Sequence, residues 1–252
     1  MTFDLVVATV DRVEELDALL TSLDEQTHRD FRVLLADQND DDRVIAVTTA
    51  HPSLDVKRIS APRGLSLARN AALSGLTADV VAFPDDDCVY PADLLARVTQ
   101  RLGDLDGVTG REPWWPTAGA ALTRDNIWNR AISFTIFLRR ELIEQVGTFD
   151  EELGLPNGSG EETDYLIRAL DTGARIDHDP TLVVEHPRKP VDRSAVGARD
   201  GASLGYILRK HRYPRRTVAR MLVRPAVGIV VDPRHAGFHF ATLRGRLRGY
   251  RS

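Results

Sequence analysis

The 252-residue sequence predicts an α/β protein with a mostly parallel central sheet flanked by helices. Apolar, β-branched runs alternate with helix-spaced apolar patterns over about the first hundred residues, which is typical of parallel strands joined by helices. The composition is that of a folded globular protein, with 42% hydrophobic and 28% charged residues. Beyond His186 the chain is rich in Pro and Arg, which adds a basic, helical C-terminal extension to the predicted fold.

Four strands, each followed by a helix, are expected in the first hundred residues. The expected strands lie at residues 5–10, 31–36 and 80–83, which are largely apolar and contain β-branched residues, and at the short segment 56–59. The expected helices have apolar residues three or four positions apart, at residues 13–23, 43–50, 65–76 and 91–102. Pro91 occupies a position that is favoured in the first turn of a helix.

The pattern is less regular between Val108 and His186. We expect a strand at 134–138, helices at 140–146 and 164–170, and short strands at 175–177 and 182–184. Gly147 and Gly173 end the two helices. This layout predicts two parts, an α/β domain at 1–187 and a basic helical extension at 188–252.

Cysteine content and hydropathy bear on location. Cys88 is the sole cysteine, so an internal disulfide is excluded and a reducing compartment is expected. The sequence does not begin with a basic segment and a long apolar run, and no apolar run approaches the roughly 18 residues of a membrane span. We expect a cytoplasmic protein, with the inner face of the plasma membrane as a further location.

The net charge of -4 conceals an asymmetry along the chain. Residues 186–252 contain 16 Lys and Arg against three acidic residues, a net charge of +13, whereas residues 1–185 carry -17. Such a tail indicates either an anionic partner, such as a membrane surface, or packing against the acidic body. Clustered arginines beside the apolar residues 227–231 are typical of an interfacial helix, and the aromatic interleaving of nucleic-acid binding is missing.

The most informative segment is Phe83-Pro84-Asp85-Asp86-Asp87. Its three adjacent carboxylates follow an expected strand, and like charges this close need a counter-charge. The carboxyl end of a strand is also where open α/β sheets bind ligands. Two carboxylates together with ligand phosphates commonly hold Mg²⁺ or Mn²⁺. The segment is therefore either part of a metal–diphosphate site or a solvated acidic turn.

Other polar residues end neighbouring strands at the same expected edge. Those at the ends of the first two strands are Thr9, Asp11, Arg12 and Asp37. Arg12, Arg63 and Arg69 suit a diphosphate, because a guanidinium binds phosphate with two parallel hydrogen bonds. The alternative for each arginine is a surface ion pair, which contributes at most about 1 kcal/mol.

A second acidic segment, Gly158-Ser159-Gly160-Glu161-Glu162, leads into an expected helix. The two glutamates are either helix N-terminal acids, which the helix dipole favours, or include a general base for a hydroxyl nucleophile. His186 is either a ligand to a manganese-type metal, together with Asp87, or a hydrogen-bonded surface residue. Trp114 and Trp115 form either a platform for a sugar ring or a hydrophobic corner.

The order of these motifs resembles the inverting family 2 glycosyltransferases of the GT-A (Rossmann-like) fold, over about residues 3–187. The strongest similarities are Gly64–Asn70 to G-x-x-x-A-R-N, Asp85–Asp87 to the D-x-D metal motif, Arg139–Glu151 to R-R-E…G-x-F-D-E, and Gly160–Arg168 to G-E-D-x-D-L-x-x-R. The first strand with Ala8–Arg12 is similar to P-x-Y-N-R without the proline. Residues 36–40 depart from the usual D-D-G-S, and Glu162 replaces the commoner Asp.

The resemblance implies roles for individual residues in a metal-dependent hexosyl or deoxyhexosyl transfer. A UDP, dTDP or GDP sugar would be bound by Thr9, Asp11, Arg12, Asp37, Gly64, Arg69, Asp85 and Asp86. Mg²⁺ or Mn²⁺ would be held by Asp85, Asp87 and His186. Glu162, or else Glu161, would remove the acceptor proton, and the acceptor would contact Trp114, Trp115 and Asp164. That acceptor is expected to be a saccharide or a lipid-linked saccharide of cell-surface polysaccharide or glycolipid synthesis.

Two alternatives remain on the sequence. A sugar-phosphate nucleotidyltransferase should carry a G-x-G-T-R-type loop after its first strand, and Thr9-Val10-Asp11-Arg12 does not match it. A degenerate carbohydrate- or anion-binding protein should have lost the residues of the chemistry. Here Asp85, Asp87, Glu162 and His186 are all present, which disfavours that alternative.

Overall fold

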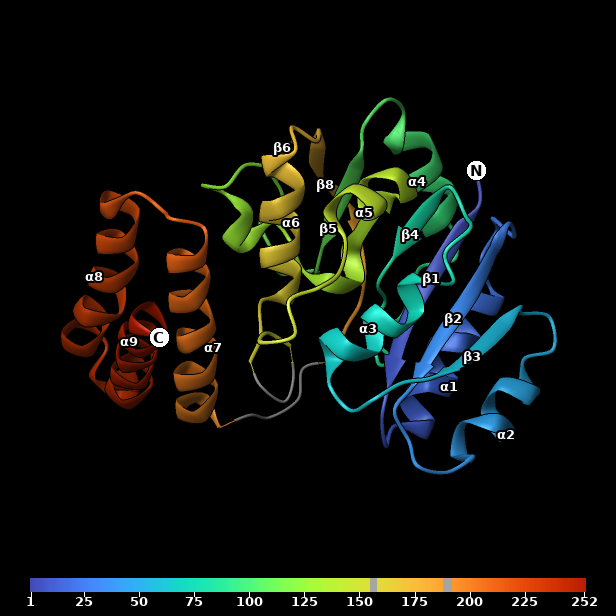
Figure 1. Ribbon diagram of the computed structural model, residues 1–252, viewed down its shortest axis with the longest axis horizontal. Coiled ribbons are helices and arrows are strands. Elements are labelled where there is room, and N and C mark those ends of the chain that lie inside the picture. The colour runs from blue at the N-terminus through green and yellow to red at the C-terminus, as the bar shows by residue number, and fades with distance from the viewer. Residues whose placement is uncertain (155–157, 188–191) are drawn as a thin grey trace.

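A computed structural model describes residues 1–154, 158–187 and 192–252 (Figure 1). Its strands are Phe3–Thr9 (β1), Phe31–Asp37 (β2), Val56–Ser60 (β3), Val80–Ala82 (β4), Gly107–Arg111 (β5), Ala120–Ala121 (β6), Ile136–Arg139 (β7) and Ile176–Val183 (β8). Its α-helices are Val13–Asp24 (α1), Arg43–Ala50 (α2), Leu65–Leu73 (α3), Leu94–Leu102 (α4), Arg140–Val146 (α5), Glu161–Asp171 (α6), Arg193–Lys210 (α7), Arg215–Val231 (α8) and Ala236–Arg251 (α9). The 3-10 turns are Ile127–Asn129 (η1), Ser133–Thr135 (η2) and Pro233–His235 (η3).

The strands form one sheet in the order β3-β2-β1-β4-β7-β5-β8-β6. β1 to β4 pair in parallel, as expected from their helical connections, and β5 pairs in parallel with β8. β7 is antiparallel to both of its neighbours, and β6 is antiparallel to β8. Thr9 pairs with Asp37, and Ala8 forms a bridge with Asp85, so the carboxyl ends of β1, β2 and β4 meet at one edge.

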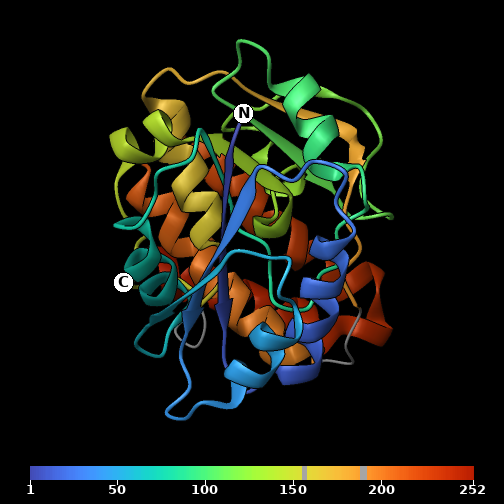
Figure 2. The same cartoon turned by 90° about the vertical axis from the view of Figure 1, so that its right-hand side faces the viewer.

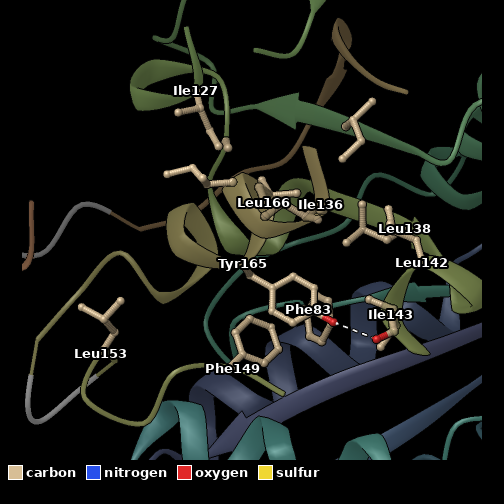
Figure 3. Packing of buried hydrophobic residues seen from close by; sticks show 14 of the residues in the cluster. Phe83, Ile127, Ile136, Leu138, Leu142, Ile143, Phe149, Leu153, Tyr165 and Leu166 are labelled. Carbon is tan, nitrogen blue, oxygen red and sulfur yellow. Dashed lines mark hydrogen bonds between the residues drawn. The ribbon is translucent and has the colours of Figure 1, made fainter. Parts of the chain in front are cut away.

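Helices cover both faces of the sheet, which explains the nearly continuous apolar runs of β1 and β2. On β1, Leu5 and Val7 belong to the apolar cluster that includes residues of α1, α2 and α4. Val6 faces the opposite cluster, with residues of α3, α5 and α6, because strand side chains alternate between the faces. Phe83, Phe149 and Tyr165 meet in this second core (Figure 3).

The C-terminal helices form a further layer beside α6, on the side away from β1–β3 (Figures 1 and 2). Ile207 and Leu208 of α7 belong to the same apolar cluster as Tyr165 of α6. The segment predicted as an extension therefore contributes to the core of the sheet-containing part. In the described residues, no helix is long and apolar enough to cross a membrane.

Glycines allow α7 and α9 to approach closely. A Cβ added at Gly205 would lie 2.2 Å from the Arg246 carbonyl oxygen, and one at Gly249 would lie 1.9 Å from that of Ala202. Real Cβ contacts are never this short, so the two backbones pack directly against each other. Only glycine permits this separation at these two positions.

The structure corrects several expected elements. β5 and β6 were not indicated by the sequence, since Gly107 and Gly110 give β5 a low strand propensity. Gly110 is required there because a Cβ would lie 2.2 Å from the Leu182 carbonyl oxygen. The two short strands expected at 175–177 and 182–184 are one strand, β8, which continues through Pro180. Residues 133–135 form η2, so β7 begins only at Ile136.

Candidate functional site

The acidic segment after β4 lies at the carboxyl edge of the parallel strands, with Arg12 as one counter-charge. Arg12 Nη1 donates to Asp86 Oδ1 at 2.7 Å and to Asp87 Oδ2 at 3.1 Å. Thr9 Oγ1 donates to the other oxygen of Asp86 at 2.8 Å. Burial raises the pKa of Asp86, and Arg12 opposes this rise. Because Asp86 and Asp87 are only 4% and 6% exposed, the segment is not a solvated turn.

Asp85 has a second counter-charge, Arg69 of α3. Arg69 Nη2 donates to Asp85 Oδ1 at 3.1 Å, and Ser133 Oγ donates to the same carboxylate. Burial raises the pKa of Asp85 to about 6, against the attraction of Arg69 and with a further contribution from Glu161. A carboxylate held in this way is stabilised by an additional cation beside it.

His186 lies against Asp87. Its Nε2 is 2.9 Å from Asp87 Oδ1, and its ring stacks on Phe134 with a centroid separation of 4.9 Å and an interplanar angle of 4°. The hydrogen bond to Asp87 raises the pKa of His186. The structure thus places His186 against Asp87, and Asp85 lies two residues before Asp87 in the same segment.

These three side chains offer carboxylate oxygens and an imidazole nitrogen, the donor set that suits Mg²⁺ or Mn²⁺. Within the ranges that the structure describes, no group of three or more His, Cys, Asp and Glu side chains is arranged to hold a metal ion by itself. Magnesium in nucleotide sites typically takes one or two carboxylates and completes its shell with phosphate and water. Asp87 and His186, which are 2.9 Å apart, have the donor types that such a metal accepts.

The two glutamates at the start of α6 have different environments. Glu161 Oε1 accepts from Arg69 Nη1 at 2.7 Å, so the buried Arg69 joins Glu161 to Asp85. Glu162 lines a small cavity with Arg69, Phe83 and other residues of the second core. Burial, with repulsion from Glu161, raises the pKa of Glu162 well above its usual value. Glu161 thus forms an ion pair with Arg69, whereas Glu162 lines the cavity.

Residues of α7 support the segment that leads into α6. Gly160 has a φ of +83°, and a Cβ there would lie 3.0 Å from Ile207 Cδ1. The Ser159 backbone N–H donates to Ser203 Oγ at 3.0 Å, and Ser159 Oγ donates to Asp200 Oδ1 at 2.9 Å. The position of the two glutamates therefore depends on a helix that follows them by more than thirty residues in the sequence.

Asp37 and Gly64 lie at the same sheet edge. Asp37 is buried and accepts from Arg58 Nε at 2.7 Å and from Asn39 Nδ2 at 2.7 Å. The Gly64 backbone N–H donates to Gln38 Oε1 at 2.8 Å, and its φ of +136° sets the entry into α3. These contacts position the ends of β2 and α3 relative to each other.

Asp11 lies at the exposed rim of this edge. It adopts a φ of 57°, and its carboxylate accepts from Arg43 Nη1 at 2.7 Å and from Arg63 Nη2 at 3.5 Å. Arg63 is therefore engaged in a surface ion pair, the alternative considered for it on the sequence. Arg12 is also partly exposed, with 40% of its side chain accessible. Unlike Arg63, Arg12 contacts the acidic segment after β4.

Trp114 and Trp115 differ in exposure. Trp114 is 46% exposed and lines a groove of about 620 Å³ together with Asp87 and His186, whereas Trp115 is partly buried. A groove of this size is in the range of ligand-binding pockets. The structure therefore places Trp114, but not Trp115, beside the expected metal ligands.

Asp164 is fully buried, which removes the surface that an acceptor would need. Its carboxylate contacts Arg168 Nε at 3.0 Å, Lys210 Nζ at 2.6 Å and His211 Nε2 at 2.8 Å. These cations, with His211 contributing most, lower the pKa of Asp164 to about 2 although burial opposes them. Asp164 joins α6 to the end of α7, and its carboxylate is not exposed to an acceptor, which disfavours the acceptor contact expected for it.

Sequence reasoning missed several residues of the site. Ser133 and Phe134 contact Asp85 and His186, and Arg58 contacts Asp37. No motif marked Ser133 or Phe134, because η2 reaches the acidic segment only through the pairing of β7 with β4. Arg58 had a usable signal, since the register of β3 beside β2 places it near the end of that strand.

Solved structures with this arrangement are glycosyltransferases of the GT-A fold. A mannosyltransferase from Pyrobaculum calidifontis, in complex with GDP-Man and Mn²⁺, is similar with a TM-score of 0.73 and 17% identity, over 98% of this chain and 86% of that one. TarS 1-349 from S. aureus, in complex with UDP-GlcNAc, has a TM-score of 0.62 and 17% identity, over 100% of this chain and 92% of that one. The fold class predicted from the sequence is confirmed.

A sequence model of glycosyl transferase family 2 matches residues 4–147, more than half of the chain. The chain belongs to this family and is a glycosyltransferase. Succinoglycan biosynthesis protein ExoM of Rhizobium meliloti is 26% identical over 90% of this chain and 77% of that protein. Glycosyltransferase AglE of Haloferax volcanii is 24% identical over 74% of this chain and 67% of that protein.

Proposed function

We propose that the enzyme transfers a hexosyl or deoxyhexosyl group from a nucleotide diphosphate sugar to an acceptor hydroxyl, with inversion and with a divalent metal. The observation that carries this proposal is the bridge made by Arg69 between Asp85 and Glu161. This bridge holds the acidic segment after β4 next to the start of α6, where Glu162 lies. The acidic segment and Glu161, the residue before the candidate base, are thereby held on the same buried cation.

The donor would lie along the carboxyl edge of β1, β2 and β4. Asp37 and Thr9 end the strands there, and the partly exposed Arg12 has further N–H groups for a diphosphate. Asp85, Asp87 and His186 would hold Mg²⁺ or Mn²⁺, which supplies positive charge to a diphosphate leaving group. Arg69 is 1% exposed, so it positions the two carboxylates instead of contacting phosphate.

Glu162 would be the general base. In the reaction the acceptor hydroxyl transfers its proton to the Glu162 carboxylate while its oxygen attacks the anomeric carbon. The bond from that carbon to the diphosphate breaks, and its electron pair leaves with the diphosphate oxygen. A raised pKa makes the carboxylate a stronger proton acceptor, and activity is expected to fall as pH drops through that pKa.

Two matched variants test this assignment. Glu162→Gln should lower kcat by about 10²- to 10⁴-fold and leave donor binding intact. Glu161→Gln should instead weaken donor binding, because it releases Arg69 and thereby disturbs Asp85. Full turnover in Glu162→Gln would exclude it as the base. Absence of turnover in the wild-type enzyme with every donor tried would favour the degenerate binding protein.

The donor base and metal can be tested by thermal unfolding with UDP, dTDP and GDP, with and without Mn²⁺. One nucleotide should stabilise the enzyme only with the metal, by about 2.7 kcal/mol at a hundredfold excess over its Kd. An Asp85→Asn/Asp87→Asn variant should lose that stabilisation. The same stabilisation without metal, or in the variant, would contradict a joint metal–diphosphate site.

The proposed acceptor is a saccharide or lipid-linked saccharide of cell-surface polysaccharide or glycolipid synthesis. Trp114 supports it, because an exposed indole beside the expected metal ligands can stack on a sugar ring. The similarity to succinoglycan biosynthesis protein ExoM supports a saccharide acceptor of polysaccharide synthesis. Such an enzyme would act in the cytoplasm, with a peripheral contact at the inner face of the plasma membrane.

A further inference from the structure

The outer face of α8 is apolar and exposed. Val223, Val227, Val230 and Val231 are 56%, 49%, 79% and 71% exposed, respectively. Their spacing of four, three and one residues places them on one side of the helix. Phe240 of α9 is 58% exposed and continues the apolar character of this layer. These five residues are called the outer apolar face below.

Exposed apolar side chains are concentrated in this layer. Of the ten large hydrophobic residues exposed within the described ranges, six lie in α8 or α9, namely the outer apolar face and Leu247. The opposite side of α8 contains the buried Val218, Pro225 and Gly228, so the helix already has a packed side. Concentration of exposed apolar residues on one surface is typical of an interaction site.

Arginines accompany the outer apolar face. Residues 215–252 contain nine Arg, no Lys and a single acidic residue, Asp232, which pairs with two histidines. In the part of the chain that the structure describes, no salt bridge involves Arg216, Arg220 or Arg224 of α8, and all three are exposed. Burial, together with repulsion from Arg224, lowers the pKa of Arg246. The layer thus has excess positive charge that its own chain does not neutralise.

We propose that the outer apolar face docks on an anionic lipid bilayer. The valines and Phe240 would enter the boundary between headgroups and acyl chains, and the arginines would contact lipid phosphates. Valines at up to 79% exposure beside arginines match a surface that is both apolar and anionic. A nucleic acid would engage the arginines and leave the valines in water. This placement concerns where the enzyme works and is independent of the donor and of the base.

Vesicle co-sedimentation of the full chain tests the proposal. Wild type should bind phosphatidylcholine vesicles that contain phosphatidylglycerol and should bind pure phosphatidylcholine much more weakly. An Arg216→Ser/Arg220→Ser/Arg224→Ser variant should bind roughly a hundredfold more weakly at low salt, since each cation contributes about 1 kcal/mol near an anionic surface. A Val230→Ser/Val231→Ser variant should also bind more weakly, by about tenfold.

The matched control is Ile45→Ser/Lys57→Ser, which removes an exposed apolar residue and an exposed cation from the acidic body. It should bind as the wild type does, and all variants should keep wild-type melting temperatures. Wild type that does not bind anionic vesicles, or valine variants that bind equally well, would overturn the proposal. A wild-type dimer that the valine variants abolish would assign the face to a second copy, and equal binding to single-stranded RNA by wild type and valine variants would assign it to nucleic acid.

Discussion

Two helices of the same basic segment, α7 and α8, have opposite environments. At the end of α7, Lys210 contacts both Asp164 and Asp150, and His211 contacts Asp164. On α8 the arginines and the four valines of the outer apolar face are exposed. The sequence alternatives for the basic tail, neutralisation by the acidic body or exposure to a partner, therefore apply to different helices. The net charge of the tail alone does not distinguish the two alternatives, because the outcome for each helix depends on whether it packs on α6.

The strongest test of this contrast is Asp164→Asn. Removal of one partner from a buried ion-pair network costs about 3–5 kcal/mol, because Arg168 loses the fully buried Asp164 carboxylate and Lys210 keeps only Asp150. Urea unfolding measures the loss. Asp171→Asn is the control, since Asp171 forms a half-exposed pair with Arg124 and should cost at most about 1 kcal/mol. Equal losses in the two variants would mean that α7 is not anchored through Asp164.

A second test targets the contact between α7 and α9. Gly205→Ala should destabilise the protein by about 1–3 kcal/mol, because the added Cβ meets the backbone of Arg246. Gly237→Ala adds the same atom to a helix where the nearest group is 3.7 Å away, so it should be neutral or stabilising. Differential scanning calorimetry compares the two. A Gly205→Ala protein as stable as Gly237→Ala would contradict the close packing of these helices.

A third test uses pH. Asp164 has a pKa of about 2 in the folded protein against a usual value of 3.8. Its contribution is present above 3.8 and is lost as pH falls toward 2, which amounts to roughly 2 kcal/mol. The free energy of unfolding should therefore fall less steeply over this window in Asp164→Asn than in the wild type. Parallel pH profiles of the two proteins would show that folding does not lower the pKa of Asp164.

The smallest effect is expected on α8. Val230→Ser and Val231→Ser should change the free energy of unfolding by less than about 0.5 kcal/mol, because both side chains are already exposed in the folded state. Chemical denaturation of the two variants checks this expectation. A loss above 1 kcal/mol would mean that the valines are packed in the folded protein and that the outer face of α8, like α7, is covered by the rest of the chain.

The parallel half of the sheet was predictable because β1, β2 and β4 contain apolar runs that alternate with helix-spaced segments. Once those strands are parallel, Thr9, Asp37 and Asp85 must share an edge, and the sequence predicted that they do. Residues supplied by the antiparallel β7 were not predictable, since Ser133 reaches Asp85 only through a pairing that no local pattern encodes. The burial of Asp164 was not predictable, because two of its three partners, Lys210 and His211, lie more than forty residues further along the chain.

The contacts of Ser159 and Gly160 with α7 bear on how the chain can be shortened. A fragment that ends at residue 187 would retain every candidate donor, metal and base residue and would lack Ser203 and Ile207. The turn before Glu161 and Glu162 would lose its contacts with α7. Tyr165 and Leu166 would lose apolar neighbours. A fragment that keeps the start of α6 in place is therefore expected to extend at least through α7, well past the residues 4–147 that the family model matches.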